Sequence, residues 1–283
     1  MVINRVIDSH CHILSPGFER RRAELLARDA TFAALFSKTG ATMATAEALI
    51  DAMDRAQVSR AVVMGMGWRD RELAQEVNDY IAESVVRYPD RLSGFCSVNP
   101  AWGDGAATEV ERCAAAGLRG VGELHPDTQG FDITGKACLA PVMDTARRLG
   151  LPVLVHSSEP VGHQYPGKGR TTPGKLYRFI ENFPENTIIC AHWGGGLPFY
   201  AMMPEVLEVI RNVYFDMAAS PFLYRPEVVA TVAGLVGADK VLFATDYPLI
   251  QHRRLIRQVE ESGLDSSAQE AILWGNAARL LGL

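Results

Sequence analysis

Short runs rich in valine, isoleucine, leucine and phenylalanine alternate along the chain with longer stretches in which apolar residues recur at helical spacing. This alternation is typical of βα units and of a parallel sheet. Eight strand-like runs occur, at residues 5–12, 60–67, 92–99, 118–125, 152–157, 187–193, 213–218 and 240–246. The helical stretches between and after them are residues 45–57, 71–88, 108–116, 135–149, 175–182, 204–211, 226–236 and 253–261. Eight strands with eight helices predict an α/β fold, the (β/α)8 TIM barrel.

Two segments fall outside the repeating pattern. Residues 267–281 form an amphipathic stretch that predicts an extra C-terminal helix. Residues 13–44 make a long first connection, for which we expect a helix at 18–28 and a position over the active site. No linker-like or low-complexity segment interrupts the chain, and its 283 residues suit one barrel of about 250 residues. The sequence therefore predicts a single barrel domain over residues 1–283.

Composition narrows the class of protein. The chain is 48% hydrophobic and 22% charged, with 28 basic against 33 acidic residues and a net charge of −5. Its dense basic clusters are short, at residues 20–22 and 253–254, which argues against nucleic-acid binding. The five cysteines show no C-x-x-C spacing, residues 1–7 lack the pattern of a signal peptide, and no apolar run reaches the length of a membrane span. We expect a cytoplasmic protein without disulfides that does not enter membranes.

Candidate chemistry lies at the ends of the predicted strands. The active site of a parallel barrel is built at the carboxyl ends of its strands, so polar residues that close the apolar runs are the ones to inspect. Five of the seven histidines lie at such ends, accompanied by two carboxylates. These seven residues are His10, His12, Glu123, His125, His156, His192 and Asp246.

The spacing of His10 and His12 indicates a metal site. Residues two apart on a strand project to the same face, so both imidazoles point into the barrel mouth. Together with His156 and Asp246 they provide nitrogen and oxygen ligands suited to a metal that activates water. A single histidine in such a place is more often a buried structural side chain, but four convergent positions favour a metal centre. Cys11, which alternates to the opposite face, is expected to be a small core residue.

The same motifs resemble the amidohydrolase superfamily, and in particular the branch of aminocarboxymuconate-semialdehyde decarboxylase and related decarboxylases, hydratases and lactonases. The resemblance spans the chain, from residues 8–12 (DSHCH) through 152–156 (PVLVH), 191–194 (AHWG) and 244–248 (ATDYP) to 275–277 (GNA). It implies one divalent ion, usually zinc, held by four ligands, with a further histidine in a catalytic role. The four implied ligands are His10, His12, His156 and Asp246, and the catalytic histidine is His192.

Two arrangements of the metal centre remain open. Asp246 is expected to orient a metal-bound water and accept its proton, while His192 polarises the substrate or positions the nucleophile. Glu123, which ends strand four, either bridges two ions or is an outer partner that fixes the tautomer of a ligand histidine. In the first arrangement His192 becomes a ligand of the second ion. His125 is expected at the rim.

Loops around the same face predict the substrate. The fifth connection, residues 158–173, is long and polar and is expected to lie over the metal. Cationic and aromatic side chains of these loops favour a small carboxylated substrate held by charge-assisted hydrogen bonds. The candidate substrate-binding residues are Arg69, His163, Tyr165, Lys168 and Trp193, with Arg170 and Arg225 nearby.

Three functions are compatible with this sequence. The first choice is metal-assisted hydrolysis of a C–N or C–O bond, and the alternative is non-oxidative decarboxylation by a similar site. The third is a barrel that has kept a structural metal and serves as a binding protein, although a closed structural site needs neither an open position nor a spare histidine. The expected partners are a small-molecule substrate and a second copy of the chain in a homo-oligomer such as a dimer.

Overall fold

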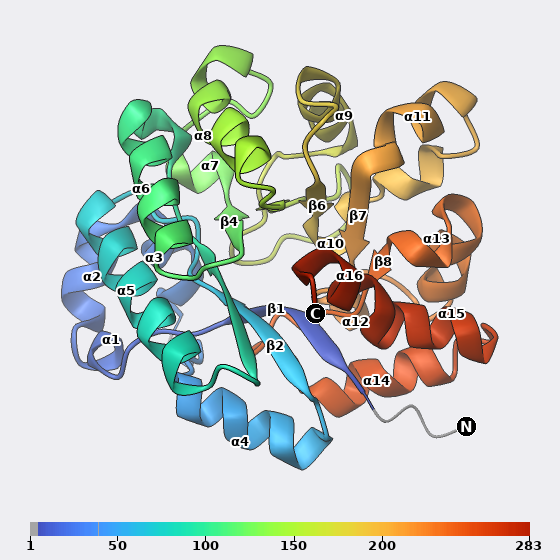
Figure 1. The fold of residues 1–283 in the computed structure, drawn as a ribbon, viewed down its shortest axis with the longest axis horizontal. Helices are drawn as coiled ribbons and strands as arrows, with labels where there is room; N and C mark the ends of the chain where they lie inside the picture. The colour runs from blue at the N-terminus through green and yellow to red at the C-terminus, as the bar shows by residue number, and fades with distance from the viewer. Residues whose placement is uncertain (1–4, 39) are drawn as a thin grey trace.

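The computed structural model describes residues 5–38 and 40–283. This part of the chain contains one parallel sheet of eight strands whose order in space follows their order in sequence. In Figure 1 the strands lie in the middle of the molecule and the helices surround them. The strands are β1 (Ile7–His12), β2 (Arg60–Met64), β3 (Leu92–Cys96), β4 (Gly120–Leu124), β5 (Val153–Val155), β6 (Ile188–Cys190), β7 (Val213–Asp216) and β8 (Val241–Leu242).

Backbone hydrogen bonds between β1 and the segment after β8 close the sheet into a barrel. Cys11 forms a parallel bridge with Tyr247. The amide of His12 donates to the carbonyl of Tyr247 at 2.7 Å, and the amide of Asp246 donates to the carbonyl of His10 at 2.9 Å. The predicted (β/α)8 TIM barrel is confirmed, and its closure brings residue 246 beside residues 10 and 12.

The helices between the strands match the predicted stretches to within a few residues. They are α4 (Ala46–Ala56), α5 (Arg71–Arg87), α6 (Asp104–Ala115), α8 (Lys136–Arg148), α9 (Pro173–Asn182), α11 (Pro204–Val209), α13 (Val228–Val236) and α14 (His252–Glu260). Shorter pieces are α7 (Pro126–Gln129), α10 (Ala191–Gly194), α12 (Ser220–Leu223), α15 (Ser266–Glu270), α16 (Asn276–Leu281), η1 (Pro100–Trp102), η2 (Leu197–Tyr200), η3 (Ile210–Asn212), η4 (Ala238–Lys240) and the π-helical η5 (Ala271–Gly275).

The structure corrects several of the predicted boundaries. The expected helix at 18–28 is divided at Arg21 into α1 (Gly17–Arg20) and α2 (Arg22–Arg28), and a third helix, α3 (Ala30–Phe36), follows. Helix α6, predicted at residues 108–116, begins at Asp104, four residues before the predicted start. All eight strands are two to five residues shorter than predicted. The chain turns after Cys190, where β6 ends, whereas the segment after Leu242 still bonds to β1. The apolar pattern continues past both points because the segments that follow are buried too.

The inner face of the barrel is an apolar cluster that the C-terminal helix completes. It consists of Ile7, Val62, Met64, Phe95, Leu154, Ile189, Ala191 and Leu242 together with Ala277, Ala278 and Leu281 of α16. The predicted C-terminal helix exists as α15, the π-helical η5 and α16. Apolar side chains fill the interior of the barrel, and their burial stabilises the strands whose ends carry the polar residues.

The segment between β1 and α4 is anchored to the barrel by one buried carboxylate. Asp29, 1% exposed, caps α3 by accepting from the amides of Thr31 and Phe32 at 2.8 and 2.9 Å. Its second oxygen accepts from the amides of Arg69 and Asp70, both at 2.8 Å. One side chain therefore satisfies four backbone donors, two at the start of α3 and two at residues 69 and 70. These bonds hold the segment between β1 and α4, residues 13–45, against the barrel, and we call this segment the insertion.

We expect Asp29→Ala to lower the free energy of unfolding by about 2–4 kcal/mol, because a helix cap is lost and buried amides are left without acceptors. Urea unfolding monitored by circular dichroism measures this difference. Glu72→Ala is the matched control, since the Glu72 side chain is 86% exposed and bonds to Arg28 at the surface; it should change stability by less than about 1 kcal/mol. Equal stability of the Asp29 variant and the wild type would contradict the anchoring role.

Among the described residues, no helix has both the length and the apolar character needed to span a membrane. Part of the N-terminal stretch considered above for a signal peptide, residues 1–4, lies outside the described residues.

Candidate metal centre

Two histidines and an aspartate converge at the mouth of the barrel. His10 and His12 come from β1, and Asp246 lies in the segment that closes the barrel after β8. The Nε2 atoms of the two histidines are 3.0 Å apart. Oδ1 of Asp246 lies 3.2 Å from Nε2 of His12 and 3.9 Å from Nε2 of His10. These three residues form a first group that could hold a metal ion.

The Nδ1 atoms of His10 and His12, their outer nitrogens, already have hydrogen-bond partners. The Nε2 atoms are therefore the nitrogens available to bind a metal. Nδ1 of His10 lies 2.9 Å from Oδ2 of Asp216, and Nδ1 of His12 lies 3.2 Å from the carbonyl oxygen of Gly65. Carboxylate and carbonyl oxygens accept hydrogen bonds, so both Nδ1 atoms carry a proton. In the neutral imidazoles, two Nε2 lone pairs then face each other at 3.0 Å beside a carboxylate. This arrangement fits a cation, and a bonded outer nitrogen is typical of metal-ligating histidine.

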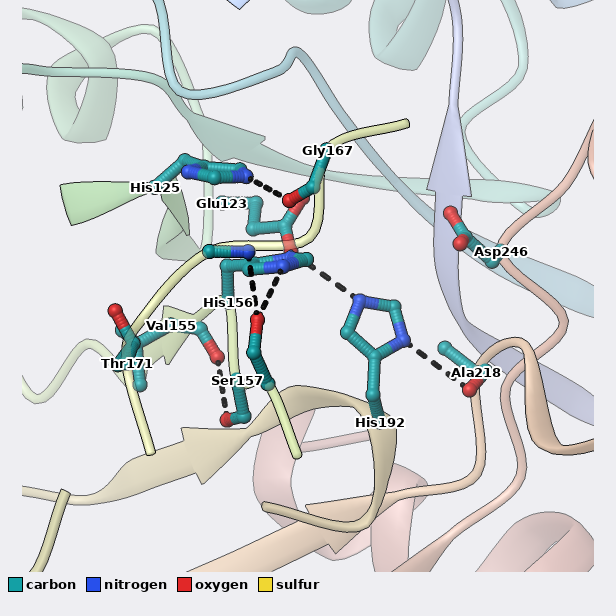
Figure 2. A network of polar contacts seen from close by, with 12 residues as sticks. Glu123, His125, Val155, His156, Ser157, Gly167, Thr171, His192, Ala218 and Asp246 are labelled. Atoms are coloured by element: carbon teal, nitrogen blue, oxygen red, sulfur yellow. Dashed lines mark hydrogen bonds and ion pairs between the residues drawn. The ribbon is translucent and has the colours of Figure 1, made fainter. Parts of the chain in front are cut away.

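A second group adjoins the first. Nδ1 of His156 lies 2.9 Å from Oε1 of Glu123, and Nε2 of His192 lies 3.7 Å from the same oxygen. The other ring nitrogen of His192 bonds to the carbonyl of Ala218 at 3.2 Å. Figure 2 shows His192 between Glu123 and Ala218, with Asp246 across from it. Glu123, His156 and His192 can also hold a metal ion.

Glu123 lies between the two groups. Its Oε2 is 3.8 Å from Nε2 of His10 and 3.7 Å from Nε2 of His12, while its Oε1 faces His156 and His192. The structure thus brings together three of the four predicted ligands, His10, His12 and Asp246, and places the fourth, His156, with Glu123 and His192 in the adjoining group. This position suits a ligand shared between two ions, and the 2.9 Å contact of Oε1 with Nδ1 of His156 equally suits an outer partner that fixes the tautomer of that histidine.

The charges of the site favour bound positive charge. Burial alone lowers the pKa of His10, but the carboxylates Asp216, Glu123 and Asp246 outweigh burial and raise it to about 9. For His192, burial again lowers the pKa, while Glu123 and the two aspartates raise it to about 10. Burial raises the pKa of Glu123 and of Asp246, yet the surrounding histidines hold both below their ordinary values. The two buried carboxylates and the partly exposed Asp246 therefore demand protons or a metal cation.

Asp216 is a residue of this site that the sequence reasoning missed. It ends β7 fully buried. One of its oxygens receives Nδ1–H of His10, and the other accepts from the amides of His192 and Ala218 at 2.9 and 3.1 Å. It therefore orients residues of both groups. The available signal was a single acidic residue inside the seventh apolar run, residues 213–218.

Three of the candidate residues occupy unusual backbone conformations. His192 (φ 56°), Trp193 (φ 56°) and Asp246 (φ 62°) lie in the left-handed region although none is glycine. Such conformations cost of order 1–3 kcal/mol and cluster at functional sites. At His192 the left-handed turn follows directly on β6, which ends at Cys190. The predicted strand residue is therefore a turn residue whose side chain meets Glu123.

A cavity of about 670 Å³ opens above both groups. Of the predicted substrate-binding residues, His163 and Tyr165 border it. The insertion contributes Lys38, which the sequence reasoning had not selected. The walls are otherwise largely apolar and include Leu35, Phe36, Met66, Ala219, Phe222, Leu223, Pro248 and Leu249.

The other candidate residues do not border this cavity. Trp193 is fully buried and its Nε1 donates to Oγ of Ser220 at 2.9 Å. Nζ of Lys168 donates to two carbonyls of its own loop, at 2.9 Å each. Arg170 is 87% exposed and pairs with Asp127, while Arg69 and Arg225 are exposed. The predicted cluster of cations over the metal site is therefore not formed, because loop cations bond within their own loops or remain in water.

A third polar group, Asp8, Cys11 and His252, is buried in the barrel wall. Cys11 is fully buried, as predicted for a core residue. Oδ1 of Asp8 accepts from the amides of His10 and Thr245 at 3.2 and 3.0 Å, and Oδ2 accepts from the Thr245 hydroxyl. Asp8 thus ties the strand of the first histidines to the segment that carries Asp246.

Comparison with known proteins agrees with this geometry. A sequence model of the family described as Amidohydrolase matches residues 7–283. The chain is 24% identical over 259 residues to a gamma-resorcylate decarboxylase of Polaromonas sp. (strain JS666 / ATCC BAA-500), covering 76% of this chain and 78% of the relative. It is 26% identical over 244 residues to the 2-amino-3-carboxymuconate-6-semialdehyde decarboxylase of Dictyostelium discoideum, covering 75% of this chain and 67% of the relative.

A solved structure confirms the fold. The 5-carboxyvanillate decarboxylase of Novosphingobium aromaticivorans DSM 12444, complexed with manganese and 4-hydroxy-3-methoxy-5-nitrobenzoic acid, superposes with a TM-score of 0.79 at 19% identity, covering 98% of this chain and 96% of the other. The family match extends from the first barrel strand to the last residue. The chain belongs to the amidohydrolase family.

Proposed function

We propose that this enzyme is a metal-dependent decarboxylase of a small carboxylated substrate. The observation that carries the proposal is that two relatives, each aligned with about three quarters of the chain, are named as decarboxylases. They support the alternative stated above better than hydrolysis, our first choice from the sequence. The ligand set alone does not separate the two reactions, because either one can use a divalent ion held by imidazole and carboxylate.

The proposed cofactor is a divalent metal ion bound by His10, His12 and Asp246, with Glu123 in reach as a further or shared ligand. Imidazole and carboxylate ligands suit both Zn²⁺ and Mn²⁺. Zinc is our expectation from the sequence, whereas the structural neighbour named above contains manganese. When bound, the ion would hold the substrate oxygens and withdraw electron density from the carbon that carries the carboxylate.

The cavity favours a flat substrate with one polar edge. Its floor carries the histidines and carboxylates of the two groups, whereas its walls include Phe36, Met66 and Phe222. Apolar walls stabilise an apolar ring or conjugated chain, and the charged floor takes the carboxylate. A substituted benzoate or an unsaturated acid fits these two requirements.

Decarboxylation requires a proton donor at the substrate carbon. The C–CO₂⁻ bond breaks, carbon dioxide leaves, and the electron pair left on carbon takes up one proton. His192 borders the cavity with Nε2 on the side of Glu123, while its Nδ1–H is held by the carbonyl of Ala218. We assign His192 to hold this proton at Nε2 and deliver it, as general acid.

Release of carbon dioxide is the decisive test. The protein, loaded with Mn²⁺ or Zn²⁺, is incubated with carboxyl-labelled γ-resorcylate, 5-carboxyvanillate and 2-amino-3-carboxymuconate-6-semialdehyde, and with lactones and amides of similar size. We expect labelled carbon dioxide from at least one acid and none from metal-free protein. Hydrolysis of a lactone or amide without carbon dioxide release would restore the hydrolase assignment, and metal binding without any turnover would favour a binding barrel.

A further inference from the structure

His125, predicted above to lie at the rim, is buried next to the metal centre and borders the cavity. It follows β4 directly and is 2% exposed. Its ring stacks on that of His156, with centroids 4.1 Å apart and planes 12° apart (Figure 2). His156 in turn points Nδ1 at Glu123. A stacked ring on one face restricts the tilt of the His156 imidazole.

The same side chain bonds to the loop that borders the cavity. Nε2 of His125 lies 2.9 Å from the carbonyl oxygen of Gly167 (Figure 2). A carbonyl accepts, so Nε2 carries the proton and donates. Gly167 belongs to the β5–α9 loop, residues 156–172, which also brings His163 and Tyr165 to the cavity. His125 therefore contacts His156 with its ring face and the β5–α9 loop with its Nε2–H.

A second contact joins His156 to the same loop. Oγ of Ser158 lies 3.3 Å from Nε2 of His156 and accepts from the amide of Gly169 at 3.0 Å. Ser158 is fully buried. The two ends of the loop are thus fastened to one another beside His156, at Ser158 and Gly169, and the part between them is fastened by His125.

We propose that His125 is a positioning residue that couples the order of the β5–α9 loop to the geometry of the metal centre. Its ring face sets the plane of His156, so that Nδ1 stays directed at Glu123, and its Nε2–H holds the loop over the cavity. The inference rests on the proposed metal centre and is independent of decarboxylation. It assigns two separable tasks to one side chain.

Two substitutions separate these tasks. His125→Phe keeps a planar ring for stacking but removes the donor to Gly167. His125→Gln places an amide nitrogen near the position of Nε2 but removes the ring. Titration with Mn²⁺ alone gives the dissociation constant of the metal, and hydrogen exchange of the loop amides gives the order of the loop; neither readout needs a substrate.

Each variant should change one of the two readouts and leave the other close to its wild-type value. We expect His125→Gln to weaken Mn²⁺ binding about 10-fold, the low end of the effect of outer-shell partners on metal affinity, with loop exchange close to that of the wild type. His125→Phe should bind Mn²⁺ within about 3-fold of the wild type, while its loop amides exchange at least about 10-fold faster, because loss of one hydrogen bond is worth about 1 kcal/mol or more.

Several outcomes would overturn the coupling. If both variants change both readouts equally, His125 is only a packing residue. If wild-type protein binds Mn²⁺ and both variants bind it equally well, the positioning role is wrong while the proposed function stands; if the wild type binds no divalent metal, the proposed function itself fails. Should the variants not fold, wild-type protein alone decides: loop amides must exchange more slowly with Mn²⁺ than without it, and unchanged exchange refutes the coupling.

Discussion

A His10→Ala, His12→Ala double variant should lose its divalent metal and its turnover while the barrel stays folded. The two Nε2 atoms, 3.0 Å apart, are the convergent nitrogen donors of the first group, and their outer nitrogens are already committed to Asp216 and Gly65. Without them Asp246 remains as a single carboxylate. Loss of the ion removes several kcal/mol of transition-state stabilisation, so turnover should fall by roughly 10³-fold or more.

Metal content and thermal unfolding, measured with and without added Mn²⁺, check this expectation. A ligand at about 1,000 times its dissociation constant stabilises the native state by about 4 kcal/mol, so Mn²⁺ should raise the Tm of the wild type and leave that of the double variant unchanged. His163→Ala is the control, because His163 borders the cavity outside both groups and should keep the ion. A double variant that retains full metal would show that the first group is not the binding site. Global unfolding of the double variant would instead indicate a structural metal.

Replacement of His192 by asparagine should lower turnover by about 10²-fold or more, the usual size of a general acid–base contribution. His192 is not needed to complete the first group of His10, His12 and Asp246. Its Nε2 instead faces Oε1 of Glu123 at 3.7 Å. If His192 acts only as a proton donor, His192→Asn keeps all of the metal; if Glu123 is shared between two ions, the same change releases one of them.

Bound metal and turnover measured on one preparation distinguish these arrangements. Wild-type protein should contain about one ion per chain in the first case and about two in the second. Arg69→Ala serves as the control, because Arg69 is exposed and does not border the cavity, and it should leave both quantities unchanged. A His192→Asn protein with full metal and nearly normal turnover would remove His192 from the mechanism.

The reaction could not be read from the ligand residues. The same imidazole and carboxylate groups support hydrolysis and decarboxylation, since each reaction only needs a cation that takes up developing negative charge. The distinction lies in what the cavity binds and where a proton is delivered. The names of two relatives therefore shifted the proposal from hydrolysis to decarboxylation.

The strands and the first metal group were predictable because they depend on local periodicity. Alternating apolar residues mark β1, and the position of His10 and His12 two residues apart puts both on one face whatever the rest of the chain does. Because the strands of the barrel are parallel, their carboxyl ends all lie at the same rim. Asp246 could be assigned to that rim without knowledge of any loop.

Tertiary structure decided everything that depends on loops and on pairing between distant residues. The left-handed turn at His192, the bonds of Asp216 to His10 and His192, and the stack of His125 on His156 join residues whose separation in sequence carries no periodic signal. The cationic side chains expected over the metal lie in solvent or bond to the backbone of their own loop. The insertion instead contributes Leu35 and Phe36 to the apolar wall of the cavity. Periodicity fixes which face a side chain takes on a strand or helix, but only the packing of the whole chain determines where a loop side chain lies.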